Sequence, residues 1–190
     1  IEDIAVDNDQ NIIVVGVFLG QAFNWGGIPL HANNSSIHVI ISKLNPSGVA
    51  IWADCSKNGQ DGYRSKAAVD GDNNIYLLGE ASAGISYDGT NYAPNCNECL
   101  YLVKFDSSGK HVWIRNVTGN GGYNIEDDRG IVVDDSGYVY VGGHHPDGYS
   151  VVARYDTSGQ QRWIVKNLQL SSEGIAVDNN GNSYIAGTAY

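Results

Sequence analysis

The sequence predicts an all-β fold made of repeated four-stranded antiparallel units. A short apolar run ending in Asp, followed by a polar turn and an apolar stretch, occurs four times, at residues 4–7, 67–70, 131–134 and 175–178. A second pattern, an apolar run that passes through a Ser-Gly turn to a Trp, occurs three times, at residues 39–52, 101–113 and 151–163. No segment shows a convincing apolar period of 3.6 residues, so almost no helix is expected.

The first pattern predicts a β-hairpin in each unit. Its apolar runs are rich in β-branched residues, and Asp, Asn and Gly lie between them at residues 8–10, 71–73, 135–137 and 179–181. These turn residues tolerate the backbone angles that a tight hairpin needs.

The second pattern predicts another hairpin, so each full unit has four strands. The Asp residues of the first pattern (7, 70, 134 and 178) are 63, 64 and 44 residues apart, which is typical of a repeat architecture. Four-stranded repeats of this kind are the blades of a β-propeller. The units run approximately over residues 1–65, 66–128, 129–172 and 173–190, within a single domain. Trp52, Trp113 and Trp163 hold the same place in successive units, which indicates packing between neighbouring blades.

The fourth unit contains the first hairpin alone. We therefore expect three complete blades plus a half blade, that is, an incomplete propeller or a fragment of a larger one. The blades should form an open arc with an exposed lateral edge unless another segment or chain completes it.

The motifs resemble those of the bacterial β-propeller repeat family SBBP and, more weakly, NHL repeats. The resemblance rests on the Ile-Ala-Val-Asp pattern, the Asn-x-Tyr-x-x-Gly stretch and the Val-x-Lys-Phe-Asp-x-Ser-Gly-x-x-x-Trp hairpin. It implies a large secreted or cell-surface bacterial protein, and no single activity.

Composition excludes some partners. The net charge is −10, with 21 acidic against 11 basic residues. Nucleic-acid phosphates call for a basic surface, so no nucleic-acid partner is expected. No apolar run approaches the roughly 18 residues of a membrane span, and the segment carries no signal peptide. An extracellular or cell-surface location is inferred from the family resemblance.

Alternation of strand direction places the tight turns on one face of the blades and the long connections on the other. Long ordered loops on a rigid scaffold commonly bind partners. The candidate binding aromatics on this face are Trp25, Tyr87, Tyr92 and Tyr123. The alternative, which we favour, is that the loops fold these aromatics over their own blades.

The acidic turns suggest a weak calcium site. Asp7, Asp9, Asp70 and Asp72 place oxygen ligands at alternate positions. Asp, Asn and Gly are also ordinary turn residues, and we favour turn chemistry over calcium. No cofactor is otherwise indicated, and no nucleophile-elbow, zinc-protease or phosphate-loop motif occurs.

The leading hypothesis is therefore a non-enzymatic secreted or cell-surface module that mediates adhesion or protein interactions. Its partner would be another protein or a neighbouring copy, contacted through the long-connection face. The alternatives are a glycan-binding propeller and, behind it, a propeller enzyme acting on a polysaccharide. Asn34 and Asn116 fit the N-glycosylation pattern, which is short and frequent by chance.

Three cysteines complete the candidate residues. Cys55 follows the last strand of the first unit, and Cys96 and Cys99 precede the third strand of the second, so all three lie on one face of adjacent blades. We favour a disulfide from Cys55 to Cys96 or Cys99. A Cys96 to Cys99 ring, a redox dithiol and a metal site remain alternatives.

Overall fold

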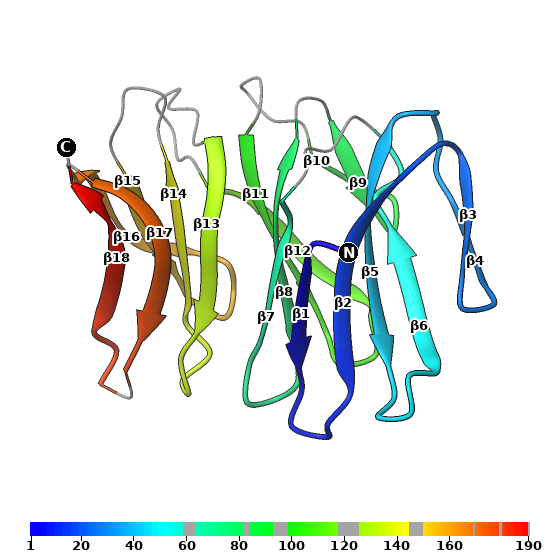
Figure 1. Ribbon diagram of the computed structural model, residues 1–190, viewed down its shortest axis with the longest axis horizontal. Helices are drawn as coiled ribbons and strands as arrows, with labels where there is room; N and C mark the ends of the chain where they lie inside the picture. The colour runs from blue at the N-terminus through cyan, green and yellow to red at the C-terminus, as the bar shows by residue number, and fades with distance from the viewer. Residues whose placement is uncertain are drawn as a thin grey trace.

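The computed structural model describes residues 1–58, 64–81, 84–92, 99–117, 126–144, 150–168, 170–178 and 180–189 (Figure 1). These residues form strands and turns, which confirms the all-β class. Within these ranges the search for a helix long and apolar enough to cross a membrane finds none.

Three antiparallel sheets have four strands each. Blade 1 has the order β1 (Asp3–Val6), β2 (Ile12–Leu19), β5 (Ile37–Leu44), β6 (Ala50–Cys55). Blade 2 consists of β7 (Lys66–Val69), β8 (Ile75–Ala81), β11 (Cys99–Phe105) and β12 (His111–Asn116). Blade 3 consists of β13 (Glu126–Val133), β14 (Val139–His144), β15 (Ser150–Tyr155) and β16 (Gln161–Leu168). The half blade is the pair β17 (Leu170–Val177) and β18 (Ser183–Ala189).

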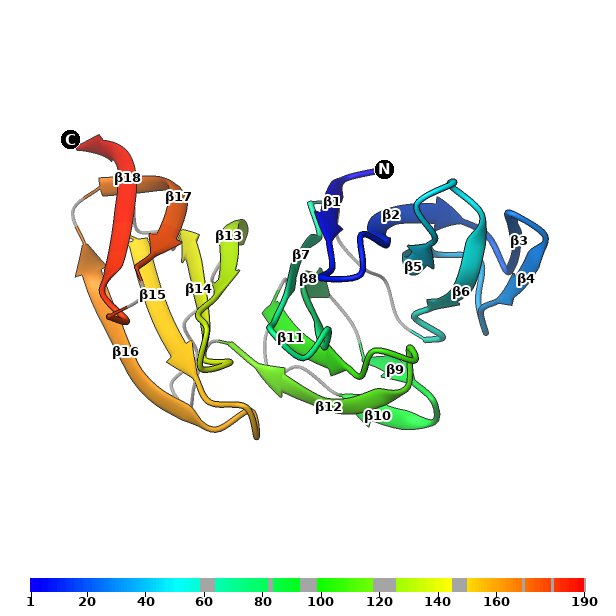
Figure 2. The same ribbon diagram turned by 90° about the horizontal axis from the view of Figure 1, so that it is seen from below.

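The blades follow one another around an open arc (Figure 2). The first strands of the blades, β1, β7, β13 and β17, line its inner side, and each contacts the next. The arc stays open between β1 and the half blade, as expected for an incomplete propeller. Figure 1 shows the short hairpin turns at one end of the blades, the tight-turn face, and the longer connections at the other, the long-connection face.

Two further hairpins lie within connections that the sequence analysis treated as loops. They are β3 (Ala22–Trp25) with β4 (Ile28–His31), and β9 (Ile85–Tyr87) with β10 (Thr90–Tyr92). Their two-residue turns hold positive φ angles, at Gly26 and Gly27 in one and at Asp88 and Gly89 in the other. Gly-Gly and Asp-Gly pairs favour this turn, so the sequence did contain the signal.

The core is divided between the blade interfaces. Because side chains alternate along a strand, Ile75 and Leu77 of β8 face blade 1 while Tyr76 and Leu78 face blade 3. All four are fully buried. Each blade is thus a thin layer whose stability depends on the blade beside it.

Trp52 and Trp113 pack between blades, as the sequence predicts. A Cβ placed on Gly109, in the β11–β12 turn, would lie 2.6 Å from Cδ2 of Trp52 in the preceding blade. Gly159, in the β15–β16 turn, lies against Trp113 in the same way. The indole of one blade therefore rests on the glycine turn of the next.

Candidate functional site

The acidic turns of the tight-turn face share one geometry. Oδ1 of Asp7 accepts hydrogen bonds from the backbone N–H groups of Asp9 (3.0 Å) and Asn11 (2.8 Å). Asp70, Asp134 and Asp178 accept the corresponding bonds in the later blades. The aspartate side chain thus organises the turn that follows its strand.

The second carboxylate oxygen meets a cation from the third strand of the same blade. Lys43 Nζ lies 2.7 Å from Asp7 Oδ2 in blade 1, and both side chains are buried. Lys104 Nζ lies 3.9 Å from Asp70 Oδ2 in blade 2. In blade 3 the cation is Arg154, 3.9 Å from Asp134 Oδ2. The pairs join the first strand of a blade to the third.

Blades 2 and 3 add a tyrosine to this arrangement. The hydroxyl of Tyr76 donates to Asp70 Oδ2 (3.0 Å), and that of Tyr140 donates to Asp134 Oδ2 (2.9 Å). Burial and the neighbouring carboxylate raise the pKa of both phenols, that of Tyr140 to about 12. The two tyrosines are therefore neutral donors near pH 7.

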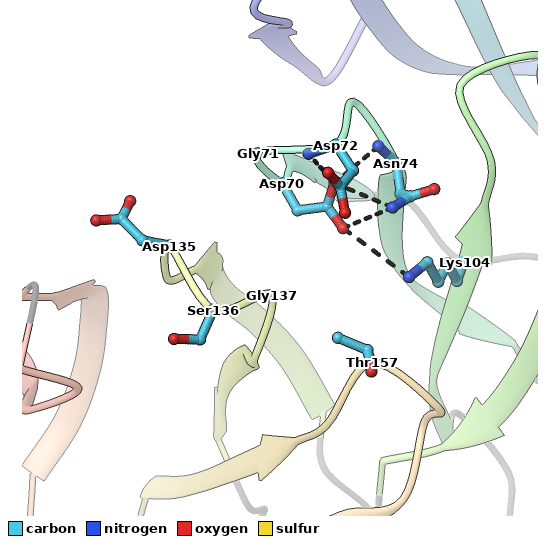
Figure 3. A pocket seen from close by; sticks show the side chains of 9 residues that line it. All are labelled: Asp70, Gly71, Asp72, Asn74, Lys104, Asp135, Ser136, Gly137 and Thr157. Atoms are coloured by element: carbon cyan, nitrogen blue, oxygen red, sulfur yellow. Dashed lines mark hydrogen bonds and ion pairs between the residues drawn. The ribbon is translucent and has the colours of Figure 1, made fainter.

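A polar pocket of about 280 Å³ opens between blades 2 and 3 on this face (Figure 3). Its lining residues are Asp70, Gly71, Asp72, Asn74, Lys104, Asp135, Ser136, Gly137 and Thr157. The lining contains two hydroxyls and no histidine, so it holds no nucleophile–base pair of the serine–histidine kind.

The matching boundary between blades 1 and 2 is closed by side chains. Asn8 N donates to Asn73 Oδ1 (2.9 Å), Asn8 Nδ2 donates to Gly71 O (3.0 Å), and Asn73 Nδ2 donates to Asp9 Oδ2 (2.8 Å). At the boundary of blades 2 and 3, Gly71 and Gly137 hold the places of Asn8 and Asn73, and the pocket is open there. The sequence does not predict this pocket, because the pocket depends on contacts between separate turns.

The calcium candidates are engaged in these turn contacts. Asp7 and Asp70 each bind two backbone N–H groups and a lysine, and Asp9 accepts from Asn73. Asp72 lines the pocket. Within the described ranges no three His, Cys, Asp or Glu side chains are grouped to hold a metal ion. Turn chemistry accounts for the contacts observed.

The candidate aromatics of the long-connection face pack onto their own blades. Trp25 is half-buried, and its Nε1 donates to Ser42 Oγ (2.9 Å). Tyr87 is fully buried, with its ring edge-on to Phe105 at 5.4 Å, and Tyr92 is half-buried beside it. Tyr123 lies outside the described residues. The exposed binding surface imagined for Tyr87 is thus a core contact, in keeping with the favoured alternative.

Cys55 is buried beneath the β3–β4 hairpin. Its Sγ lies 3.6 Å from His31 O and 3.4 Å from Lys57 Nζ. The structure shows no disulfide in the part of the chain that it describes. Cys96 and the side chain of Cys99 fall outside that part, so the bridge stays a prediction.

The two glycosylation candidates differ in position. Asn34 lies between β4 and β5, where its Oδ1 accepts from Ser36 N (3.0 Å). Asn116 is the last residue of β12 and pairs with Tyr101.

Acid should destabilise the protein through the aspartates of the turns. Burial alone would raise the pKa of Asp7, but hydrogen bonds from Lys43 and Asn11 hold it below the usual value. The pKa of Asp106 and Asp156 is likewise lowered, chiefly by Ser108 and Ser158, and Asn182 lowers that of Asp178 to about 2. A carboxylate whose pKa is lower in the folded chain than in the unfolded chain stabilises the fold at pH values above its unfolded pKa of about 4. That stabilisation is lost as the pH falls through the pKa of the folded chain. We expect the free energy of unfolding, from urea titrations, to fall between about pH 5 and 2.

Asp106→Asn provides the matched control. Asn45 holds the same turn position in blade 1, where its amide oxygen accepts from Ser47 N and Val49 N (both 2.9 Å). The variant should keep these turn bonds but lose the stabilisation that the Asp106 carboxylate adds at pH 7, so its free energy of unfolding should fall less steeply as the pH is lowered. If the free energy of unfolding of the variant depended on pH as steeply as that of the unmodified chain, Asp106 would not contribute to the loss of stability in acid.

Comparison with known proteins agrees with this architecture. Residues 167–190 match the family model for the SBBP β-propeller repeat. The chain is also 30% identical, over 155 residues, to an uncharacterised WD repeat-containing protein of Acanthamoeba polyphaga mimivirus. The match covers 74% of this chain and 11% of that relative, so the chain spans a small part of the relative's length. The three four-stranded blades and the half blade form an incomplete β-propeller, whose last hairpin is similar to the SBBP β-propeller repeat.

Proposed function

We propose that the chain is a non-enzymatic protein-interaction module of a secreted or cell-surface protein, and that its partner contacts the long-connection face at blade 1. The repeat family and the WD repeat-containing relative support a role in protein interaction. The extracellular location rests on the SBBP resemblance.

Two exposed apolar side chains carry the proposal. Leu19, at the end of β2, is 74% exposed, and Phe23, in β3, is 41% exposed. The ring of Phe23 stacks on the buried Phe18 with centroids 5.6 Å apart, so it is held on the blade surface. Fixed apolar side chains at a surface lose little entropy when a partner covers them.

Comparison of the two hairpins supports a protein as the partner. In the β3–β4 register Phe23 pairs with Leu30, as Ile85 pairs with Tyr92 in β9–β10. Ile85 is buried in the core shared by blades 1 and 2, whereas Phe23 is exposed. A protein surface that covers Phe23 would give it the burial that Ile85 already has in the corresponding position.

The test is capture of binding proteins by the immobilised chain, compared across charge variants. Leu19→Asp and Phe23→Asp should each reduce capture at least tenfold, because a desolvated charge at an interface centre is costly. Val112→Asp is the control, since the exposure of Val112, 50%, lies between those of Phe23 and Leu19, and Val112 lies at the tight-turn end of β12. Equal loss in all three variants, or capture that survives both test substitutions, would contradict the proposal. Binding on a glycan array that depends on Phe23 would favour a glycan-binding propeller instead.

A further inference from the structure

The side-chain carboxamide of Asn73, in the turn between β7 and β8, bridges the turns of blades 1 and 2. Its Oδ1 accepts a hydrogen bond from Asn8 N (2.9 Å), and its Nδ2 donates to Asp9 Oδ2 (2.8 Å). A primary carboxamide has both a donor and an acceptor, so it fits a backbone N–H group that lies beside a carboxylate. The N–H of Asn8 and the carboxylate of Asp9 therefore form a carboxamide-binding pair.

The turn of blade 2 repeats this pair at the boundary with blade 3. Gly71 and Asp72 hold the places of Asn8 and Asp9. The turn after β7 has the geometry of the turn after β1, because the two backbone hydrogen bonds to Oδ1 of its first aspartate, Asp70, are 3.0 and 2.8 Å long in both. Gly71 and Asp72 both line the pocket between blades 2 and 3 (Figure 3). The pocket thus contains a second carboxamide-binding pair.

Blade 3 supplies no carboxamide to this second pair. Gly137 holds the place of Asn73 and has no side chain. Its φ of +77° is close to the +63° of Asn73, and both residues donate the same backbone hydrogen bond within the turn. Among the described residues, neither the N–H of Gly71 nor the carboxylate of Asp72 has a hydrogen-bond partner. Solvent or a ligand has to satisfy both groups.

Lys104 adds a buried donor to the pocket. Its side chain is 10% exposed, and its Nζ lies 3.9 Å from Asp70 Oδ2, which is longer than a hydrogen bond. The corresponding distance from Lys43 to Asp7 in blade 1 is 2.7 Å. In the described part of the chain Lys104 Nζ makes no hydrogen bond, so it can donate to an oxygen atom in the pocket. The volume of about 280 Å³ is close to the lower end of the range for ligand pockets, about 300 Å³.

We propose that this pocket binds a primary carboxamide, the side-chain group of an asparagine or glutamine presented by a protein partner. The carboxamide oxygen accepts from Gly71 N, its NH2 group donates to the Asp72 carboxylate, and Lys104 donates to a carbonyl oxygen of the same partner. An asparagine side chain of the chain itself occupies the equivalent place between blades 1 and 2. A neutral group is favoured over an anion, because Asp70, Asp72 and Asp135 outnumber the lysine in the pocket lining.

The test is a titration of the intact chain, labelled with nitrogen-15, with N-acetyl-asparagine methylamide. The amide resonance of Gly71 should shift saturably, with a dissociation constant in the millimolar range, because one side chain makes few contacts. The leucine derivative, which is close to asparagine in shape but has an apolar side chain, should give no saturable shift. The aspartate derivative should bind at least tenfold more weakly, because its carboxylate has no donor and is repelled by Asp72.

Asp72→Asn gives the decisive comparison. This variant replaces the acceptor in the pocket by an NH2 group that can donate, so it should prefer the aspartate derivative to the asparagine derivative. Asp88→Asn makes the same charge change at an exposed turn outside the pocket and should keep the preference for asparagine. The same preference in both variants would overturn the proposal.

Gly137→Asn should close the pocket from within, because it restores the side chain that Asn73 provides in blade 2. The added Cβ would lie 2.9 Å from Cγ2 of Thr157, a methyl group at the end of an exposed side chain that can turn aside. Binding should fall at least tenfold. Gly48→Asn is the control, since Gly48 also has a positive φ, +81°, and lies outside the pocket.

Three results would contradict a carboxamide ligand. They are no saturable shift of Gly71 in the unmodified chain, equal shifts with the leucine derivative, and tighter binding of methyl glucoside, which would make hydroxyl groups the ligand. The pocket lies on the tight-turn face and the surface of the proposed function lies on the long-connection face, so either proposal can fail alone.

Discussion

Replacing Asp7 by Ala should lower the free energy of unfolding by about 3–5 kcal/mol, the cost of leaving a buried charge without its partner. Lys43 is buried, and its ammonium group has Asp7 Oδ2 at 2.7 Å and a weaker contact with Ser107 O at 3.4 Å. The same substitution removes the acceptor for Asp9 N and Asn11 N, so the β1–β2 turn loses its organising group. Urea or guanidinium denaturation at pH 7 measures the loss.

Two comparisons separate the ion pair from the turn. Lys43→Met removes the buried cation and leaves the turn bonds of Asp7 intact. The loss of stability in the variant that carries both Asp7→Ala and Lys43→Met should therefore be smaller than the sum of the losses in the two single variants. Asp178→Ala removes a half-buried aspartate with the same turn bonds and no cation in the described residues. A loss in Asp178→Ala as large as that in Asp7→Ala would show that the turn, and not the buried pair, dominates.

Gly109→Ala should destabilise the protein by about 2–5 kcal/mol, combining the cost of a left-handed backbone with that of overpacking. Gly109 has φ +88°, which residues with a Cβ rarely adopt. The added Cβ would also lie 2.6 Å from Cδ2 of Trp52, whose indole is fixed between blades 1 and 2. The turn and the indole cannot both keep their positions.

Gly48→Ala is the matched control for this substitution. Gly48 holds the same turn position in blade 1 with φ +81°, and nothing lies within 4 Å of its added Cβ. Gly48→Ala should lower the free energy of unfolding only by the cost of the left-handed backbone conformation, about 1–2 kcal/mol. The difference between the two losses in denaturation measures the packing of one blade on the next. Equal losses would contradict the close contact between Trp52 and Gly109.

The sequence by itself determined the strands of the blades and their turns. Hairpins depend on local chemistry, namely alternating apolar residues and turn residues such as those at 7–11 and 45–49, and the motif repeats with that chemistry intact. The half blade could be predicted for the same reason, because residues 173–190 carry the motif of the first hairpin. The β3–β4 and β9–β10 hairpins carried the Gly26-Gly27 and Asp88-Gly89 signals as well.

Only the tertiary structure decided what the side chains meet. Asp7 contacts Lys43 because β2 lies between β1 and β5, and Trp52 contacts Gly109 because two blades stack. The same stacking buries Tyr87, which a loop position had suggested as exposed, and leaves a pocket beside Asp70 where Gly71 and Gly137 stand in place of Asn8 and Asn73. Such contacts join residues that are far apart in the chain. They cannot be predicted from the local sequence, because they arise from how the sheets pack against one another.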